Sequence, residues 1–151
     1  MNNITKREIE KLTDNLPAIR KVAGWSSEEL GRFIGVTKQT ISNIETHKNV
    51  MTKTQYIAIR TVIDYEIIEK PENELLAKVV TILLDTDDSE ENLTIATATR
   101  EMLEKIPKSA IKNGALIGVS AVLGFVAGAV LTPVIKPATT LSTKWLKKIL
   151  K

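Results

Sequence analysis

The chain has 151 residues, a formal net charge of +3 and no cysteine. The lack of cysteine excludes disulfides and thiolate metal sites and fits a reducing compartment, so we expect a cytoplasmic protein. Aromatic residues make up only 4%, which disfavours stacking on single-stranded nucleic acid. The net charge is +2 over residues 1–70, −4 over 71–113 and +5 over 114–151, so the chain divides into blocks.

The first block opens with a helical pattern that we place from about Thr13, after a short polar arm or helical turn. The apolar positions recur at helical spacing; they include Ile9, Leu12, Leu16, Ile19 and Val22. Pro17 is expected near the start of this helix, where its missing N–H does no harm.

Two short helical patterns follow between Trp25 and Lys48. Ser26 predicts a helix start, and Glu29 three residues later completes a capping box. The apolar face of this helix is expected to hold Leu30, Phe33 and Ile34. Gly35 then allows a sharp turn, because glycine adopts a positive φ without steric cost.

The second of these helices is expected from Lys38 to Thr46, with Thr37 as its cap. Ile41 and Ile44 predict its buried side. The opposite side carries amides, hydroxyls and one lysine, which suit the hydrogen-bonding edges of bases in the major groove. The candidate base contacts are Lys38, Gln39, Thr40, Ser42 and Asn43. This spacing predicts a helix-turn-helix with a recognition helix.

The motif resembles the Cro/C1-type (XRE) helix-turn-helix family of phage and bacterial repressors over roughly residues 13–68. The matching residues are Trp25, Ser26, Glu28, Glu29, Leu30, Gly35, Val36, Thr37, Ile41, Ser42, Ile44 and Glu45. The resemblance implies an all-α domain with five helices over residues 1–70 and a dimeric DNA-binding regulator. Gly31 replaces the usual alanine, which keeps the close helix approach but weakens the helix by about 1 kcal/mol. His47 replaces the usual glycine, so that turn is expected to be strained or differently shaped.

A further helix is capped by Thr52, with Gln55 supplying a second capping box, and it runs to about Lys70. Its isoleucine-rich pattern is expected to close the core of the domain. The stretch 65–68 near its end is also a candidate contact with a second copy of the chain.

Residues 71–113 predict an acidic helical hairpin. Its helices are expected at Glu72–Leu84 and Leu93–Ile106, on either side of the acidic loop Asp85–Glu91. The loop lacks the glycine and final glutamate of a calcium loop in the required places, so we expect no metal site there. The hairpin either dimerises or extends the packing of the first block.

Residues 114–136 form a glycine-striped hydrophobic segment. Gly114 to Ile135 is 22 residues without a charge; as a helix it would span roughly 33 Å, against about 30 Å for a bilayer core. Glycines spaced four apart favour close association of membrane helices. We expect a transmembrane helix; a buried soluble helix or a glycine-rich oligomer core is the alternative.

Residues 137–151 predict a basic amphipathic helix. Lysines occupy one side and apolar residues the other, among them Trp145 and Ile149. This pattern is typical of a helix lying in a membrane interface. Contact with DNA phosphates, or docking on the acidic hairpin, is the alternative.

These features predict a sequence-specific regulator that binds double-stranded DNA, as a homodimer on an inverted-repeat operator, with no catalytic, metal or cofactor site. By the family resemblance it is a repressor. Ser27, Thr37 and Lys48 are the candidate phosphate contacts. Membrane association through residues 114–151 would tether it to the cytoplasmic membrane. The alternative is a membrane-anchored sensor or membrane-active effector, such as a toxin–antitoxin or phage-defence component, with an autoregulatory DNA-binding domain.

Overall fold

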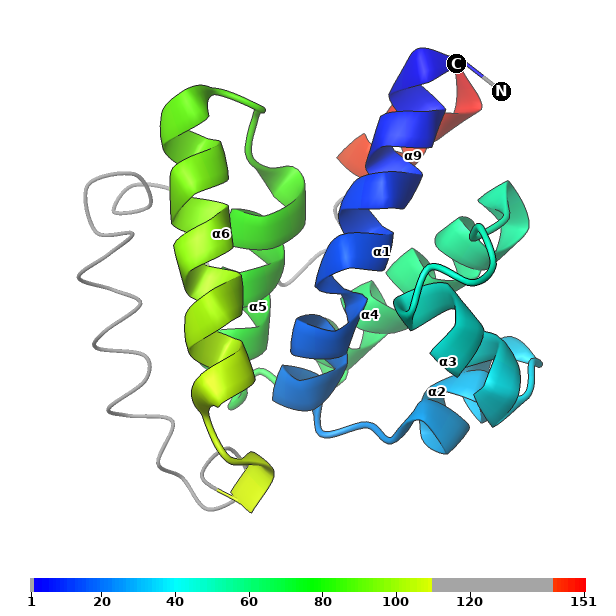
Figure 1. Ribbon diagram of the computed structural model, residues 1–151, viewed down its shortest axis with the longest axis vertical. Helices are drawn as coiled ribbons and strands as arrows, with labels where there is room; N and C mark the ends of the chain where they lie inside the picture. Colours follow the sequence, from blue (N-terminus) through cyan, green and yellow to red (C-terminus); the bar gives the residue numbers. More distant parts are fainter. Residues whose placement is uncertain (1, 110–142) are drawn as a thin grey trace.

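The computed structural model describes residues 2–109 and 143–151, and within them it is helical with no strand, which confirms the expected all-α class (Figure 1). The elements are α1 (Asn3–Ala23), α2 (Ser27–Ile34), α3 (Lys38–Glu45), α4 (Lys53–Glu69), α5 (Glu74–Val80), the π-helical turn η1 (Thr81–Asp85), α6 (Glu90–Lys105) and α9 (Lys144–Leu150).

The helix starts follow the capping residues seen in the sequence. Ser26 and Glu29 form a complete capping box at α2, and Thr52 and Gln55 form another at α4. At α3 the Thr37 side chain accepts a hydrogen bond from the backbone N–H of Thr40 at 3.1 Å. Each cap satisfies backbone donors that the first turn of a helix leaves free. The predicted starts of these helices are therefore confirmed, whereas α3 ends at Glu45, one residue before the predicted Thr46.

The first helix is longer than predicted. It begins at Asn3, because the Asn2 side chain accepts from the Thr5 N–H at 2.8 Å and caps it. Pro17 consequently lies inside the helix, so its placement near a helix start was wrong. The apolar spacing before Thr13 continues the same buried face, and Ile9 is 2% exposed. The segment predicted as a short polar arm or helical turn is the first half of α1.

The expectation of five helices over residues 1–70 is also wrong, since the described part of that range, 2–70, holds four. The arm and first helix are one element, and α4 runs from Lys53 to Glu69 as a single helix. The α4 segment contains neither glycine nor proline, so nothing in its sequence interrupts the backbone hydrogen bonds.

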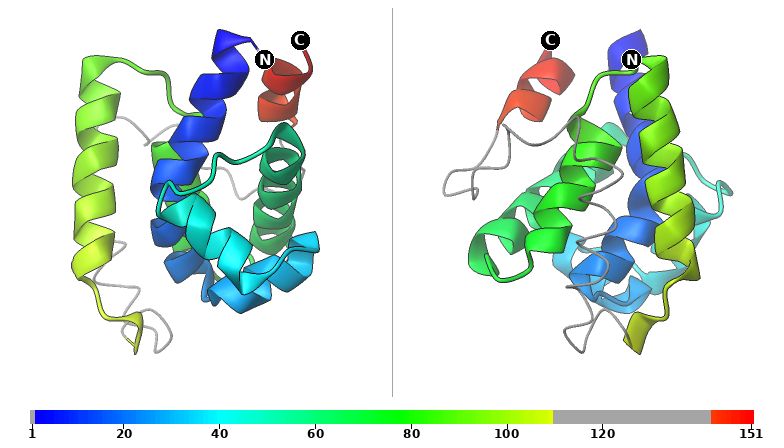
Figure 2. Two further views of the ribbon diagram at one scale, coloured as in Figure 1. Left: turned by 45° about the vertical axis from the view of Figure 1, so that its right-hand side comes forward. Right: turned by 90° about the vertical axis from the view of Figure 1, so that its left-hand side faces the viewer.

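One hydrophobic core joins the first block to the hairpin. It includes Leu12 and Ile19 of α1 together with Leu76, Leu83 and Leu103 from beyond residue 70. Figures 1 and 2 show α1 running between the α5–α6 pair and the α2–α4 group. The hairpin therefore extends the packing of the first block, which is one of the two arrangements that its sequence allowed.

Polar contacts hold the same interface. The Asn73 amide donates to the carbonyl of Val22 at 3.1 Å and also caps α5. Lys21 donates to the carbonyl of Leu103 at 2.7 Å, at the end of α6 where carbonyls lack helical partners. These bonds connect both ends of the hairpin to the end of α1.

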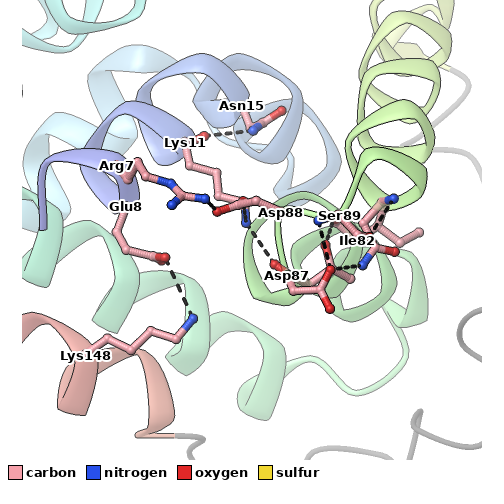
Figure 3. A network of polar contacts seen from close by, with 11 residues as sticks. Arg7, Glu8, Lys11, Asn15, Ile82, Asp87, Asp88, Ser89 and Lys148 are labelled. Carbon is pink, nitrogen blue, oxygen red and sulfur yellow. Dashed lines mark hydrogen bonds and ion pairs between the residues drawn. The ribbon is translucent and has the colours of Figure 1, made fainter. Parts of the chain in front are cut away.

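The acidic loop is shorter than the predicted Asp85–Glu91, since η1 ends at Asp85 and α6 begins at Glu90, and it is held by cations and backbone donors. Asp88 pairs with Arg7 and Lys11 of α1 (Figure 3). Asp87 accepts from the Ser89 N–H at 3.0 Å, which lowers the pKa of its carboxyl. Among the described residues no cluster of His, Asp and Glu could hold a metal ion.

The C-terminal helix α9 packs against α1 and α4 (Figure 2). It does not dock on the acidic hairpin, because its apolar face meets a complementary surface on the first block. No helix of residues 2–109 and 143–151 is long and apolar enough to cross a bilayer. The predicted transmembrane segment, residues 114–136, lies outside the described residues.

Candidate nucleic-acid interface

The turn between α2 and α3 brings the two helices into close contact. Gly35 has φ 76°, and its N–H bonds to the carbonyl of Gly31, which also accepts from the Val36 N–H at 2.8 Å. A Cβ added at Gly31 would lie 2.6 Å from the carbonyl oxygen of Val36. Glycine at position 31 therefore permits the approach, and the alanine usual in the family does not fit this turn.

The inner side of α3 anchors it to the core. Ile41 and Ile44 are 0% and 1% exposed, as their spacing predicted. At the end of the helix, Glu45 accepts two hydrogen bonds from Arg20 of α1, at 2.7 and 3.1 Å. Arg20 also donates to the carbonyl of Trp25 at 2.9 Å, so one guanidinium joins α1, α3 and the start of the motif. Charged bidentate pairs of this kind stabilise the fold and also fix the relative orientation of the two helices that they join.

The outer side of α3 carries all five candidate base-contact residues. Lys38 and Gln39 are exposed, and Thr40, Ser42 and Asn43 are half-exposed. The Gln39 amide donates to the Asn43 side-chain oxygen at 2.9 Å. Since both amides lie on one helical face and are oriented by each other, they present donors and acceptors in a defined direction.

The three candidate phosphate contacts lie around this face. Thr37 is exposed, and its hydroxyl is 3.0 Å from that of Thr40. Ser27 is the first residue of α2 and is half-exposed. Lys48 is exposed in the loop after α3. Hydroxyls at helix starts and a lysine beside α3 have the chemistry that holds a phosphate backbone.

Two features near the motif differ from a simple amphipathic pattern. Phe33 is 54% exposed, so it does not join the core as predicted; its ring meets the edge of Trp25 with centroids 5.6 Å apart. His47 has φ 59°, a left-handed conformation at the position where the family usually has glycine. A side chain with a Cβ is disfavoured in this conformation, so of the two outcomes expected at His47 the structure shows the strained turn.

The sequence reading missed the residues that position α3. Arg20 stands among the apolar positions of the α1 segment, and a basic residue in such a place is itself a signal of a buried ion pair. Glu45 was noted only for its match to the family. Their 25-residue separation gave no local sign that they meet.

No family model, curated protein or solved structure matches the chain in comparison with known proteins. The resemblance to the Cro/C1-type family therefore stays a prediction from the motif residues of the sequence.

Proposed function

We propose that residues 3–69 form the DNA-binding unit of a sequence-specific transcriptional regulator, with α3 as the recognition helix in the major groove. The observation that carries the proposal is the division of α3 into two sides. Ile41 and Ile44 are buried, whereas Gln39 and Asn43 face outward beside hydroxyls and a lysine. By the family resemblance, the regulator is a repressor.

The amide pair is the proposed reader of base edges. Glutamine and asparagine pair bidentately with adenine, and each such pair contributes about 1–3 kcal/mol of discrimination. On DNA, Gln39 and Asn43 exchange their mutual 2.9 Å hydrogen bond for bonds to bases. Because that bond is exposed, its exchange costs little net free energy. Lys38, Thr40 and Ser42 add contacts along the same face.

Phosphate contacts set the register of the helix in the groove. Ser27 and Thr37 lie at the starts of α2 and α3, where backbone N–H groups and the helix dipole favour an anion. Lys48 adds a cation on the loop that follows. Contacts of this kind orient the protein without reading sequence.

The proposed regulator acts as a homodimer on an inverted repeat in double-stranded DNA, since two half-sites raise both affinity and specificity. Tyr65, which is 59% exposed near the end of α4, is the proposed contact with the second copy.

The test begins by selecting the preferred site from random double-stranded DNA with the full chain. Affinity for that site and for unrelated DNA is then measured for Gln39→Ala and Lys48→Ala. Gln39→Ala is expected to lose about 1–3 kcal/mol on the selected site only, whereas Lys48→Ala should weaken both and reduce the salt slope by about 1. Equal losses of Gln39→Ala on both DNAs, or no selected site at all, contradict the proposal.

A further inference from the structure

The C-terminal helix buries its apolar side against the first block, where Trp145 and Ile149 join the same hydrophobic cluster as Tyr56. Trp145 and Ile149 are 6% and 1% exposed in that position. The Trp145 ring meets the edge of Tyr56, with centroids 5.8 Å apart, and its Nε1 donates to Asp64 at 2.7 Å. The Arg60 guanidinium lies 5.2 Å from the Trp145 ring centroid, within reach of a cation–π contact.

We define the α9 docking surface as Glu8, Tyr56, Arg60 and Asp64. The last three lie four residues apart along α4 and so share one face of it. Glu8 of α1 adds an ion pair with Lys148, with 3.7 Å between the charged atoms (Figure 3). The surface matches a basic helix that carries one tryptophan.

Docking has a built-in cost. Arg60 is 1% exposed, and although it pairs with Asp85 at 3.0 Å, its Nε and Nη1 have no hydrogen-bond partner among the described residues. Burying a charged group with incomplete partners opposes the gain from apolar contact. When α9 leaves, water can hydrate Arg60 and Asp64. The docked state is therefore suited to reversible release.

The other side of α9 has the composition of a membrane-surface helix. Lys144, Lys147, Lys148 and Lys151 are all exposed, and Leu150 remains 65% exposed beside them. Lysines on one side with tryptophan and leucine on the other favour the interface of an anionic bilayer. Such binding needs Trp145 and Ile149 to enter the lipid, which docking on α4 prevents.

We propose that α9 exchanges between the α9 docking surface and an anionic lipid surface, which compete for the same apolar side of the helix. The first block thus buries the membrane-binding side of α9 until α9 binds a negatively charged bilayer instead. The inference goes beyond DNA binding and does not require it. In Figure 1, α9 lies beside the N-terminal end of α1, and α2 lies at the other end of α1. Helix α9 therefore does not cover α2, whether α9 is docked or released.

The exchange can be followed by a distance measurement, because the chain has no cysteine of its own. Cysteines introduced at the exposed positions Thr61 and Lys151 carry spin labels on α4 and at the end of α9. In buffer the full-length chain should show one short distance. Vesicles of phosphatidylcholine with phosphatidylserine should convert it to longer distances, and vesicles of phosphatidylcholine alone should leave it short.

Two substitutions on α4 provide a matched pair, since each removes one negative charge. Asp64→Ala deletes the acceptor of Trp145 and should release α9 at about fivefold less anionic lipid, the effect of one hydrogen bond. Glu69→Ala, at an exposed position, should behave like the parent chain.

An unchanged distance in the presence of anionic vesicles overturns the proposal. Vesicle binding without a change of distance would assign the membrane affinity to residues outside α9, and it overturns the exchange as well. Equal effects of the two α4 substitutions would show that charge alone governs release and would contradict the role of Trp145 docking. Binding to DNA is measured separately, so a failure of the proposed function is distinguishable from each of these results.

Discussion

Arg20 of α1 donates two hydrogen bonds, of 2.7 and 3.1 Å, to the carboxylate of Glu45 at the end of α3, and both side chains are largely buried. The pair fixes the end of α3 against α1. Its planar geometry suits arginine and not lysine, which is a point charge on a flexible stem.

Arg20→Lys is therefore expected to lower the free energy of unfolding by about 2 kcal/mol, because Glu45 and the Trp25 carbonyl lose donors in a partly buried place. Urea denaturation measures the change. Arg32→Lys, at an exposed position on α2, is the matched control and should change stability by less than about 0.5 kcal/mol. Similar losses at the two sites would refute the special role of Arg20.

Gly31→Ala tests the close approach in the turn. Helix propensity alone predicts a gain of about 1 kcal/mol from alanine inside α2. The structure predicts a loss of stability, because the new Cβ would lie 2.6 Å from the backbone oxygen of Val36. Moving the backbone to relieve this clash would cost free energy. The sign of the change in thermal or urea denaturation decides between the two. A more stable Gly31→Ala variant would mean that the turn is looser than described.

His47→Gly tests the left-handed residue after the recognition helix. A residue with a Cβ at φ 59° is disfavoured, and glycine relieves this at an entropic cost in the unfolded chain. We expect a net gain in the free energy of unfolding of about 0.5–1 kcal/mol. Asn49→Gly is the control, since position 49 has no positive φ, and it should lose stability.

Asp64 gives a pH dependence with a defined sign. Burial raises the pKa of its carboxyl, and the opposing effects of Arg60 and the Trp145 hydrogen bond do not cancel that rise. A carboxyl with a raised pKa in the folded state contributes stability that is full below its ordinary pKa and is lost as the pH rises through the raised pKa.

Asp64→Asn keeps an oxygen acceptor for Trp145 and removes this titration. The free energy of unfolding of the variant, minus that of the parent chain, should therefore increase as the pH rises from about 4 to 7. The difference is measured by urea denaturation at each pH. A difference that is constant with pH, or that falls, contradicts the raised pKa.

Local signals explain most of what the sequence predicted correctly. Ser26, Thr37 and Thr52 mark helix starts because a side-chain oxygen there satisfies backbone donors within three residues. Gly35 marks the turn because its conformation is disfavoured for other residues. These effects act over one helical turn, so the residues involved are neighbours in the sequence and the effects can be predicted from it.

The features that were missed depend on residues far apart in the chain. Pro17 signalled a helix start locally, but the buried face of α1 continues through it. Arg60 is a cation within an apolar run of the sequence, and Asp85 and Trp145 from later segments cover it. Only the packing of distant segments decides such cases, and single-sequence periodicity carries no information about it.

The position of α9 at residues 144–150 has a consequence for how the protein is made. Synthesis runs from the N-terminus, and segments fold as they emerge. Helices α1 to α4 have been synthesised before the ribosome makes Trp145. The α4 face that includes Tyr56 and Arg60 is therefore exposed to water until that point. Docking of α9 on this face thus follows the synthesis of the face itself, and the chain passes through the undocked form before it reaches the docked one.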